Sequence, residues 1–397
     1  MNPRLTPARA AIAGGTAVVA AAAAVTVSLA LTHGAAAPAA PASSARPASA
    51  RLAASSCTGP AGGAYVALPG YQAFDSYSTA NCELIQQYNV GDSEVPGTGT
   101  ADFNYDSTDE GVALSPDGST LYFANTGNDT VSVVPLDQLT VSNYANPVET
   151  LIHVGQDPES LAVSPDGSQV WVADTGPQTG LPSLGGISVI STATDTVTAT
   201  LPMPLTDPRS VAFSPSGANV YVTTSLGLYV YSTASRRLVA LVPGLGDPEG
   251  VAVSADGKSV YVTNTVQGVV DVISAATNRV TGTIGVGQLP WQLALSPDGG
   301  TLYVANGDSN SVSVIAVASN KVTGTIPDPG DPVSVAVTPD GSELWVGALT
   351  SGTISVFSTS NDSLTGTFSV GYGGAANSGD GDEPTGIALT STPPVGA

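Results

Sequence analysis

Short apolar stretches, in which β-branched and small residues alternate, recur along the chain between glycine- and proline-rich turns. Six of these stretches lead into one turn, Ser-Pro-Asp-Gly or a close variant of it. The six copies span residues 111–118, 161–167, 211–217, 251–257, 293–299 and 335–341. In such a turn proline restricts φ, aspartate hydrogen-bonds the backbone and glycine takes the left-handed conformation, so each copy predicts a β-hairpin.

Each copy continues into three further predicted strands. An aromatic residue flanked by apolar ones marks the second strand, as in Val260–Asn264, and a stretch such as Val312–Ile315 marks the third. The fourth alternates threonine with apolar or small residues, as in Val322–Ile326. Alternation over five positions favours strands over helices. A repeat of about 40 to 50 residues with four strands is the size of one β-propeller blade.

Two incomplete copies remain at the ends of the repeat region. Ala64–Leu68, Ala73–Tyr77 and Leu84–Val90 are predicted as second, third and fourth strands, and Thr385–Thr390 as a first strand. Joined, they would form one more blade and close the ring, which removes the open sheet edges. We therefore predict an all-β fold, a seven-bladed β-propeller of four-stranded antiparallel blades closed by the N- and C-terminal strands. A six-bladed ring with additional terminal segments is the alternative.

These repeats resemble the YVTN-type β-propeller repeat family, whose name motif is present literally at Tyr261–Asn264. The resemblance extends from Ala64 to Leu389, and the sequence departs from the motif at Ser216, Ala255 and Gly347. It implies the propeller fold but no single function, because similar propellers serve as binding platforms, as parts of surface proteins and as enzyme domains.

The N-terminal segment has the composition of an export signal. Arg4 and Arg9 precede an alanine-rich apolar stretch, residues 10–32, with small residues at 35–37. We predict a signal peptide over residues 1–37, although a stretch of this length can also span a bilayer as an uncleaved anchor. An Ala/Pro/Ser-rich linker is predicted over 38–60, the propeller over 61–392 and a tail over 393–397. The protein is therefore expected to be secreted or to lie at the cell surface.

The two cysteines of the chain are Cys57 and Cys82. An even number of cysteines in an exported protein indicates a disulfide, because the compartment is oxidising. The predicted bond between them would tie the segment before the propeller to the first strands of the ring.

Charge narrows the classes of function. The formal net charge is −22, and all 32 acidic residues lie at or after Asp75. Such a surface repels phosphate backbones, so we expect no nucleic-acid partner. We expect a monomer that contacts a membrane only through an uncleaved N-terminal segment. The two histidines, His33 and His153, are too few for a histidine-rich metal centre.

The candidate ligand residues follow the prolines that precede the first strands. A recurrent Asp-Pro is expected to be a turn device, but the residue after it varies. It is Glu159, Arg209, Glu249 and Trp291 in four successive repeats. We predict that they ring the channel mouth, where the charged groups could hold a polar ligand and Trp291 could stack on it. The alternative is an ion pair between blades that an aromatic ring covers.

No residue is assigned a catalytic role, because nothing in the sequence pairs two carboxylates as acid and base and no phosphate-binding or dinucleotide motif is present. No cofactor is predicted. Calcium is considered for Asp380, Asp382 and Glu383, since carboxylates beside glycine can bind this ion. Their spacing differs from that of known calcium loops, and a solvated acidic loop is the alternative.

Three functions remain open at this point. The preferred hypothesis is an exported binding scaffold for a protein or glycan ligand. The first alternative, implied by activities found on similar propellers, is a cation-dependent enzyme of lactonase or lyase type. The second alternative is a structural spacer in the cell envelope.

Overall fold

The computed structural model describes residues 62–68, 73–89, 111–139, 149–176, 185–203, 206–370 and 384–391. All of them belong to the unit Ser49–Ala397. The predicted signal segment, the linker and the tail lie outside the described residues, so these domain boundaries stay predictions. Among the described residues, no helix has the length and apolar character that crossing a membrane requires.

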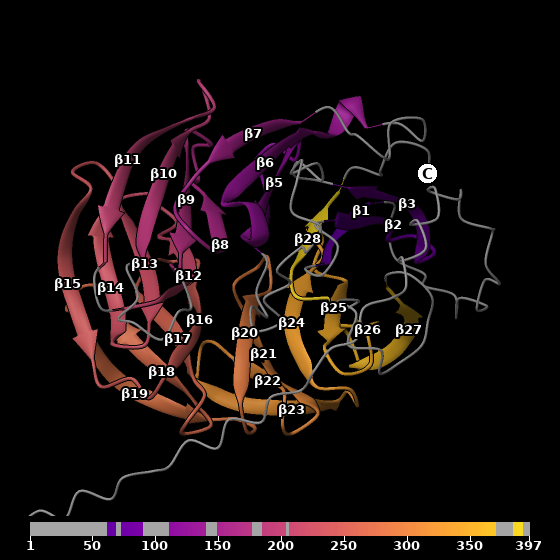
Figure 1. The fold of residues 1–397 in the computed structure, drawn as a ribbon. Helices are drawn as coiled ribbons and strands as arrows, with labels where there is room; N and C mark the ends of the chain where they lie inside the picture. The colour runs from indigo at the N-terminus through magenta and orange to yellow at the C-terminus, as the bar shows by residue number, and fades with distance from the viewer. Residues whose placement is uncertain are drawn as a thin grey trace, which may run out of the picture. The chain divides into compact units, whose positions relative to one another are not determined.

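The described strands form seven four-stranded antiparallel sheets, which are the blades of a propeller (Figure 1). Blade 1 consists of β4 (Val112–Leu114), β5 (Thr120–Asn125), β6 (Thr130–Pro135) and β7 (Thr150–His153). Blade 2 consists of β8 (Pro158–Val163), β9 (Gln169–Asp174), β10 (Gly186–Ser191) and β11 (Thr196–Pro202). Blade 3 consists of β12 (Pro208–Phe213), β13 (Asn219–Thr224), β14 (Gly227–Ser232) and β15 (Arg237–Pro243). Two short 3₁₀ helices, η2 (Thr126–Asn128) and η3 (Leu136–Gln138), belong to blade 1.

The remaining blades repeat this order. Blade 4 consists of β16 (Pro248–Val253), β17 (Ser259–Asn264), β18 (Val269–Ser274) and β19 (Arg279–Gly285). Blade 5 consists of β20 (Pro290–Leu295), β21 (Thr301–Asn306), β22 (Ser311–Ala316) and β23 (Lys321–Pro327). Blade 6 consists of β24 (Pro332–Val337), β25 (Glu343–Ala348), β26 (Thr353–Ser358) and β27 (Ser363–Ser369). Blade 7 consists of β28 (Ile387–Thr390), β1 (Gly63–Leu68), β2 (Ala73–Ser78) and β3 (Glu83–Asn89).

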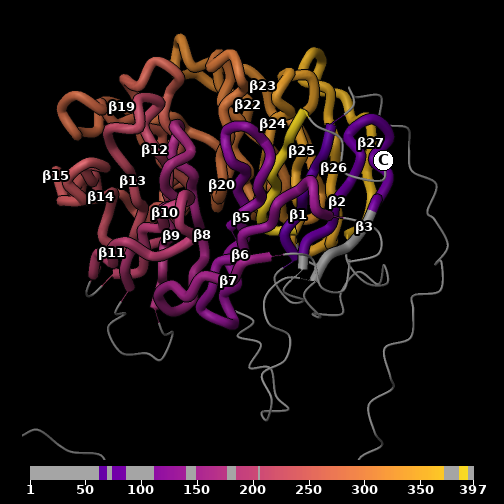
Figure 2. Tube along the Cα trace, turned by 90° about the horizontal axis from the view of Figure 1, so that it is seen from above, coloured from indigo at the N-terminus to yellow at the C-terminus, as the bar shows by residue number. Residues whose placement is uncertain are grey.

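The two ends of the chain share the seventh blade, in the strand order β28-β1-β2-β3. Gly63 pairs with Thr390 and Val66 with Ile387, so the last strand completes the sheet begun by the first. In Figures 1 and 2 the indigo N-terminal strands accordingly lie beside the yellow C-terminal ones. The innermost strands β4, β8, β12, β16, β20, β24 and β28 contact one another in sequence around a closed circle. The prediction of seven blades closed by the chain ends is confirmed.

Seven hydrophobic clusters hold the ring together, one at each interface between neighbouring blades. Strand β13 is apolar at consecutive positions because each of its two faces packs against a neighbouring blade. Val220 and Val222 face blade 2 and Trp171, whereas Tyr221 faces blade 4. Burial of one such side chain contributes about 1.5–3 kcal/mol. A strand buried on both faces therefore loses the apolar–polar alternation that a half-exposed strand would show.

The predicted turn between the first and second strands has the expected geometry. In blade 2 the backbone N–H of Gly167 donates to the carbonyl of Ser164 at 2.8 Å, and Gly167 has a φ of +71°. The carboxylate of Asp166 accepts the N–H of Ser168 at 3.1 Å. Ser216, which departs from the motif, changes little, because Gly217 keeps a φ of +69°. The conformation of the turn thus depends more on its glycine than on its aspartate.

Candidate functional site

A pocket with a volume of about 190 Å³ lies at the centre of the ring, and every one of the seven innermost chain segments contributes to its lining. The lining residues follow the loops that lead into the first strands, so the pocket opens at that end of the ring. Its polar side chains are Glu159, Ser160, Ser210, Gln292, Ser334 and Thr385. The apolar lining comes from the next positions along the strands, among them Leu161, Val211 and Val335.

Of the four predicted ligand residues, only Glu159 lines this pocket. The polar lining comes mainly from one residue further along, such as Ser160, Ser210 and Ser334. The reason lies in the backbone. The ladder between the first two strands is interrupted immediately after the proline, for example between Pro208 and Val211. Side-chain directions in this stretch therefore depart from the regular alternation of a strand. The recurrence of small polar residues at this position was the sequence signal that could have located the pocket.

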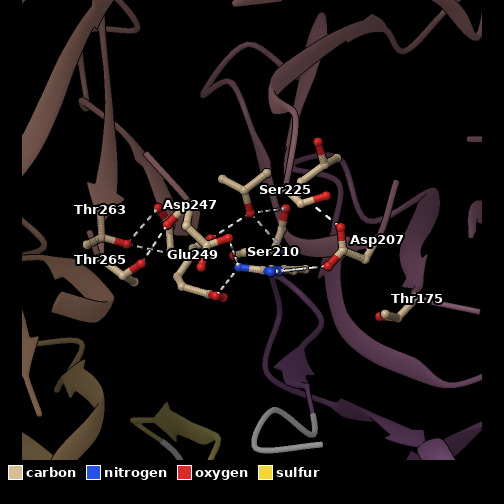
Figure 3. A network of polar contacts seen from close by, with 12 residues as sticks. Thr175, Asp207, Ser210, Ser225, Asp247, Glu249, Thr263 and Thr265 are labelled. Carbon is tan, nitrogen blue, oxygen red and sulfur yellow. Dashed lines mark hydrogen bonds and ion pairs between the residues drawn. The ribbon is translucent and has the colours of Figure 1, made fainter. Parts of the chain in front are cut away.

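Arg209, on β12, joins blades 3 and 4 through the carboxylates of three residues. These residues, Asp207, Asp247 and Glu249, are labelled in Figure 3. Its Nη1 atom lies 2.8 Å from Oδ1 of Asp247 and also pairs with Oε1 of Glu249. Its Nη2 atom lies 3.1 Å from Oδ2 of Asp207. Asp207 precedes β12, whereas Asp247 and Glu249 belong to the segment that begins blade 4. The structure therefore contains the ion pair between blades that formed part of the alternative in the sequence analysis.

The surroundings keep this cluster ionised. Burial opposes the charge of the guanidinium, but Glu249, Asp207 and Asp247 more than offset it and raise the pKa of Arg209 above its usual value. Burial would likewise raise the pKa of Asp207, yet the hydrogen bond from Ser225 and the charge of Arg209 hold this pKa below its usual range. The N–H of Ser225 lies 3.2 Å from Oδ1 of Asp207. Because Asp207 stays charged and bound at neutral pH, it is poorly suited to take up a proton.

Trp291 lies on β20 but is not among the residues that line the pocket. A Cβ atom added at Gly307 would lie 3.0 Å from the indole Nε1, so the ring packs over this glycine of its own blade. The structure therefore does not bring Trp291 to the central pocket beside Glu159. Glu159 itself is 9% exposed and lies on β8, across the ring from blade 5.

The described residues do not fit a divalent cation. Within these residues, no group of three His, Cys, Asp or Glu side chains could hold a metal ion. The three carboxylates that do converge near the channel mouth, Asp207, Asp247 and Glu249, surround the guanidinium of Arg209 instead. Calcium prefers six to eight oxygen ligands, and this arrangement offers it none that is not already paired with Arg209. The calcium candidates Asp380, Asp382 and Glu383 lie outside the described residues.

The structure describes one of the two cysteines of the predicted disulfide. Cys82, at the turn before β3, is 3% exposed and disulfide-bonded. The predicted partner, Cys57, lies outside the described residues, so the pairing of the two stays a prediction.

Residues 8–226 match the family model described as "SMP-30/Gluconolactonase/LRE-like region", and this match covers more than half of the 397 residues. The chain belongs to this family. Residues 199–328 also match the model described as "Lactonase, 7-bladed beta-propeller". None of the curated proteins matches the chain in sequence.

Solved structures share the fold at low sequence identity. A putative 6-phosphogluconolactonase from Bacteroides fragilis is 17% identical, with a TM-score of 0.62, over 84% of this chain and 99% of that one. A periplasmic gluconolactonase from Pseudomonas aeruginosa is 20% identical, with a TM-score of 0.58, over 77% and 95%. A protein of unknown function from Desulfotomaculum acetoxidans is 17% identical, with a TM-score of 0.64, over 83% and 99%.

The preferred hypothesis of the sequence analysis, a binding scaffold, is wrong. Both matching family models describe lactonase-type propellers, and they favour the alternative that the sequence analysis carried. The scaffold hypothesis rested on the absence of a paired acid and base. That absence was weak evidence, because Glu159, the carboxylate that reaches the pocket, lies on β8 directly after an Asp-Pro pair that was interpreted as a turn device alone.

Proposed function

We propose that this protein is a lactonase-type hydrolase that opens a sugar lactone in the central pocket. The observation that carries the proposal is the position of Glu159. Among the lining residues that the structure describes, it is the one titratable side chain. It lies among hydroxyl and amide groups on the axis of a propeller of a gluconolactonase family.

In the proposed reaction Glu159 acts as general base toward a water molecule. The water oxygen forms a bond to the lactone carbonyl carbon, and the carboxylate accepts its proton. The ring C–O bond then breaks, and the proton passes to the departing ring oxygen, so that the product is a hydroxycarboxylic acid. Hydroxyl and amide donors of the lining, such as Ser160, Ser210 and Gln292, are suited to stabilise the negative charge that develops on the carbonyl oxygen.

The lining favours a polyhydroxylated substrate. Serine, threonine, glutamine and glutamate side chains face the pocket from five different blades. They can exchange hydrogen bonds with sugar hydroxyls, whereas an aliphatic lactone offers them only its carbonyl and ring oxygens. Two of the similar structures bear the names of sugar-lactone hydrolases, a putative 6-phosphogluconolactonase and a periplasmic gluconolactonase.

The proposed reaction uses no metal ion at the described residues, because the three carboxylates that converge beside the pocket, Asp207, Asp247 and Glu249, are paired with Arg209. Arg209 has a positioning role. By tying Asp207 to Glu249 across two blades, it holds the segments that carry Ser210 and Val251 at the pocket wall.

Two finer features complete the proposal. The YVTN-type signature at Tyr261–Asn264 is the repeat form of this propeller. The apolar N-terminal segment directs export, which agrees with the periplasmic location named for the Pseudomonas aeruginosa neighbour.

The test is hydrolysis by the purified chain of a panel of sugar lactones and unsubstituted lactones, with the hydroxy acids identified by mass spectrometry. We expect sugar lactones to be opened faster than in buffer, and unsubstituted ones less. Gln292→Trp, which fills the pocket from blade 5, should remove this activity while the melting temperature is kept. Rates equal to buffer for every lactone, or full activity in Gln292→Trp, would reject the proposal.

A further inference from the structure

The positive charges of the described residues are gathered at one end of three consecutive blades. The described chain holds six Lys and Arg residues, and only Arg209 lies at the end where the pocket opens. The other five are Arg236, Arg237, Lys258, Arg279 and Lys321. They lie in, or next to, turns that join first to second or third to fourth strands of blades 3, 4 and 5. In an antiparallel blade these turns share the end opposite to the pocket.

The cations recur at one register position, which separates these blades from their neighbours. The outermost strands of blades 3, 4 and 5 begin with Arg237, Arg279 and Lys321. In blades 2 and 6 the same position holds Thr196 and Ser363. In Figure 1 the strands β15, β19 and β23 follow one another along the outer rim. Neither the fold nor the turn requires a cation here, since the flanking blades do without one.

The turn residue just before these strands follows the same division. It has a positive φ in each of blades 2 to 6 and is Asp195, Arg236, Asn278, Asn320 and Asp362 in that order. Aspartate and asparagine suit the left-handed conformation, whereas arginine is strained there. Blades 3 to 5 thus lack the acid that both flanking blades carry. We call Arg236, Arg237, Arg279 and Lys321 the basic rim.

The charges of the basic rim are available to an outside partner. Arg237, Arg279 and Lys321 are exposed, and none of them forms an ion pair with another residue of the described chain. Lys258, by contrast, lies 3.0 Å from Asp256. Arg236 is partly occupied, since its Nη2 donates to the hydroxyl of Thr198 at 2.9 Å.

Exposed apolar side chains lie beside these cations. They are Leu238 (49% exposed), Val239 (56%), Leu241 (42%), Val280 (42%) and Val322 (38%). Two of them replace threonines. At the position of Val239, blades 2, 4, 5 and 6 carry threonines whose hydroxyls donate to the neighbouring strand, as Thr281 does to the carbonyl of Val272 at 3.0 Å. Blade 3 gives up this hydrogen bond and presents an apolar surface instead.

We propose that the basic rim and its apolar neighbours dock the propeller on an anionic lipid bilayer. A chain with a formal net charge of −22 is repelled by such a surface as a whole, whereas at this end of blades 3 to 5 the five cations outnumber the two turn carboxylates, Asp256 and Asp298. Cations interleaved with aliphatic side chains match the boundary between headgroups and acyl chains, which offers both partners in one layer. This surface lies opposite to the pocket, so a docked molecule keeps its pocket open to solvent. The contact is independent of the N-terminal segment and goes beyond the proposed hydrolysis.

The test is co-sedimentation of the full chain with vesicles of phosphatidylcholine, alone or mixed with phosphatidylglycerol, at low and high salt. We expect binding to the anionic vesicles to exceed binding to the neutral ones and to fall at high salt. The variant Arg237→Thr, Arg279→Thr, Lys321→Ser takes the residue types of blades 2 and 6. Its affinity for the anionic vesicles should be at least about tenfold lower than that of wild type. Lys258→Ser, at the same end but ion-paired with Asp256, is the matched control and should bind nearly as wild type does.

A second variant tests the apolar part without changing charge. Val239→Thr with Leu241→Thr takes the residues of blades 2, 4, 5 and 6, so it should fold and yet bind anionic vesicles more weakly. Equal binding of wild type and the triple variant would overturn the proposal. So would binding of soluble polyglutamate without binding of vesicles, because that would assign the basic rim to an acidic protein. Melting temperatures of all variants exclude unfolding as the cause.

Discussion

Asp174→Asn is expected to stabilise the protein at neutral pH and to have almost no effect in acid. Asp174 ends β9 and is 2% exposed. One carboxylate oxygen accepts the hydroxyl of Ser188 at 2.7 Å, and the other has no hydrogen-bond partner among the described residues. Burial raises the pKa of Asp174 to about 7, although the hydrogen bond from Ser188 opposes this. The folded state therefore holds this proton more tightly than the unfolded chain does.

The sign and size follow from proton linkage. The unfolded carboxyl titrates near 3.8 and the folded one near 7. The stability that the neutral carboxyl contributes is thus present below pH 4 and is lost as the pH rises through about 7. Each pKa unit corresponds to about 1.4 kcal/mol, so ionisation costs on the order of 4 kcal/mol at pH 8. Asp328, whose pKa burial raises to about 6, adds to the loss in the same direction.

Asparagine is the residue that other blades use at this position. In blade 5 the amide of Asn306 donates to the hydroxyl of Ser313 at 3.0 Å, and its oxygen accepts the N–H of Gly287 at 3.0 Å. Ser188 and Gly155 occupy the matching positions around Asp174, so an amide there can make the same bonds. Asp174→Asn should then keep the fold and remove the cost of ionisation.

The assay is urea-induced unfolding of wild type and variant at pH 4.5 and pH 8. We expect Asp174→Asn to raise the free energy of unfolding at pH 8 by about 2–4 kcal/mol, or Tm by about 5 °C, and to change it little at pH 4.5. The reverse change, Asn306→Asp, should create the same loss on raising the pH. The reasoning would be refuted if the difference in the free energy of unfolding between variant and wild type were the same at both pH values.

Three further predictions concern the segments around the pocket. Arg209→Met leaves Glu249, which is 9% exposed, without its guanidinium partner. It should cost about 2–4 kcal/mol in urea melts, with partial recovery on adding Glu249→Gln; a fully additive loss would contradict the pairing. Gly250→Ala would bring a Cβ atom to 2.8 Å from the carbonyl oxygen of Trp291. It should cost about 1–3 kcal/mol in thermal melts, and an unchanged Tm would show that the strands can separate freely. Neither EDTA nor added calcium should alter Tm or lactone hydrolysis, since Arg209 occupies the converging carboxylates; a calcium-dependent rise in Tm would argue for a cation site.

The architecture was predictable because the sequence contains six complete copies of the same four-strand repeat. Each Ser-Pro-Asp-Gly turn and each aromatic strand repeats the same local solution, so an error in one copy is corrected by the others. The incomplete copies at the two ends then determined how the ring closes, as the pairing of Val66 with Ile387 confirms.

The site was less accessible to the same reasoning. The predicted ring of Glu159, Arg209, Glu249 and Trp291 assumed that equivalent positions point the same way. The interrupted ladder after each proline changes these directions, so that Arg209 meets two neighbouring segments while Ser210 lines the pocket. Such an interruption of the strand pairing cannot be recognised from the pattern of apolar and polar residues in the sequence. The basic rim, by contrast, is visible in the sequence once the register of the outermost strands is known.

The central claim is that Glu159 acts as general base in the hydrolysis of a sugar lactone in the central pocket. The most direct test is the rate of sugar-lactone hydrolysis by Glu159→Gln, measured in a pH-stat as release of acid. Loss of a general base lowers kcat by about 10²–10⁴-fold. The account predicts a fall in this range for Glu159→Gln, with wild-type rates for Glu83→Gln on the outer strand β3. Wild-type rates in Glu159→Gln would contradict the assignment of the reaction to the central pocket.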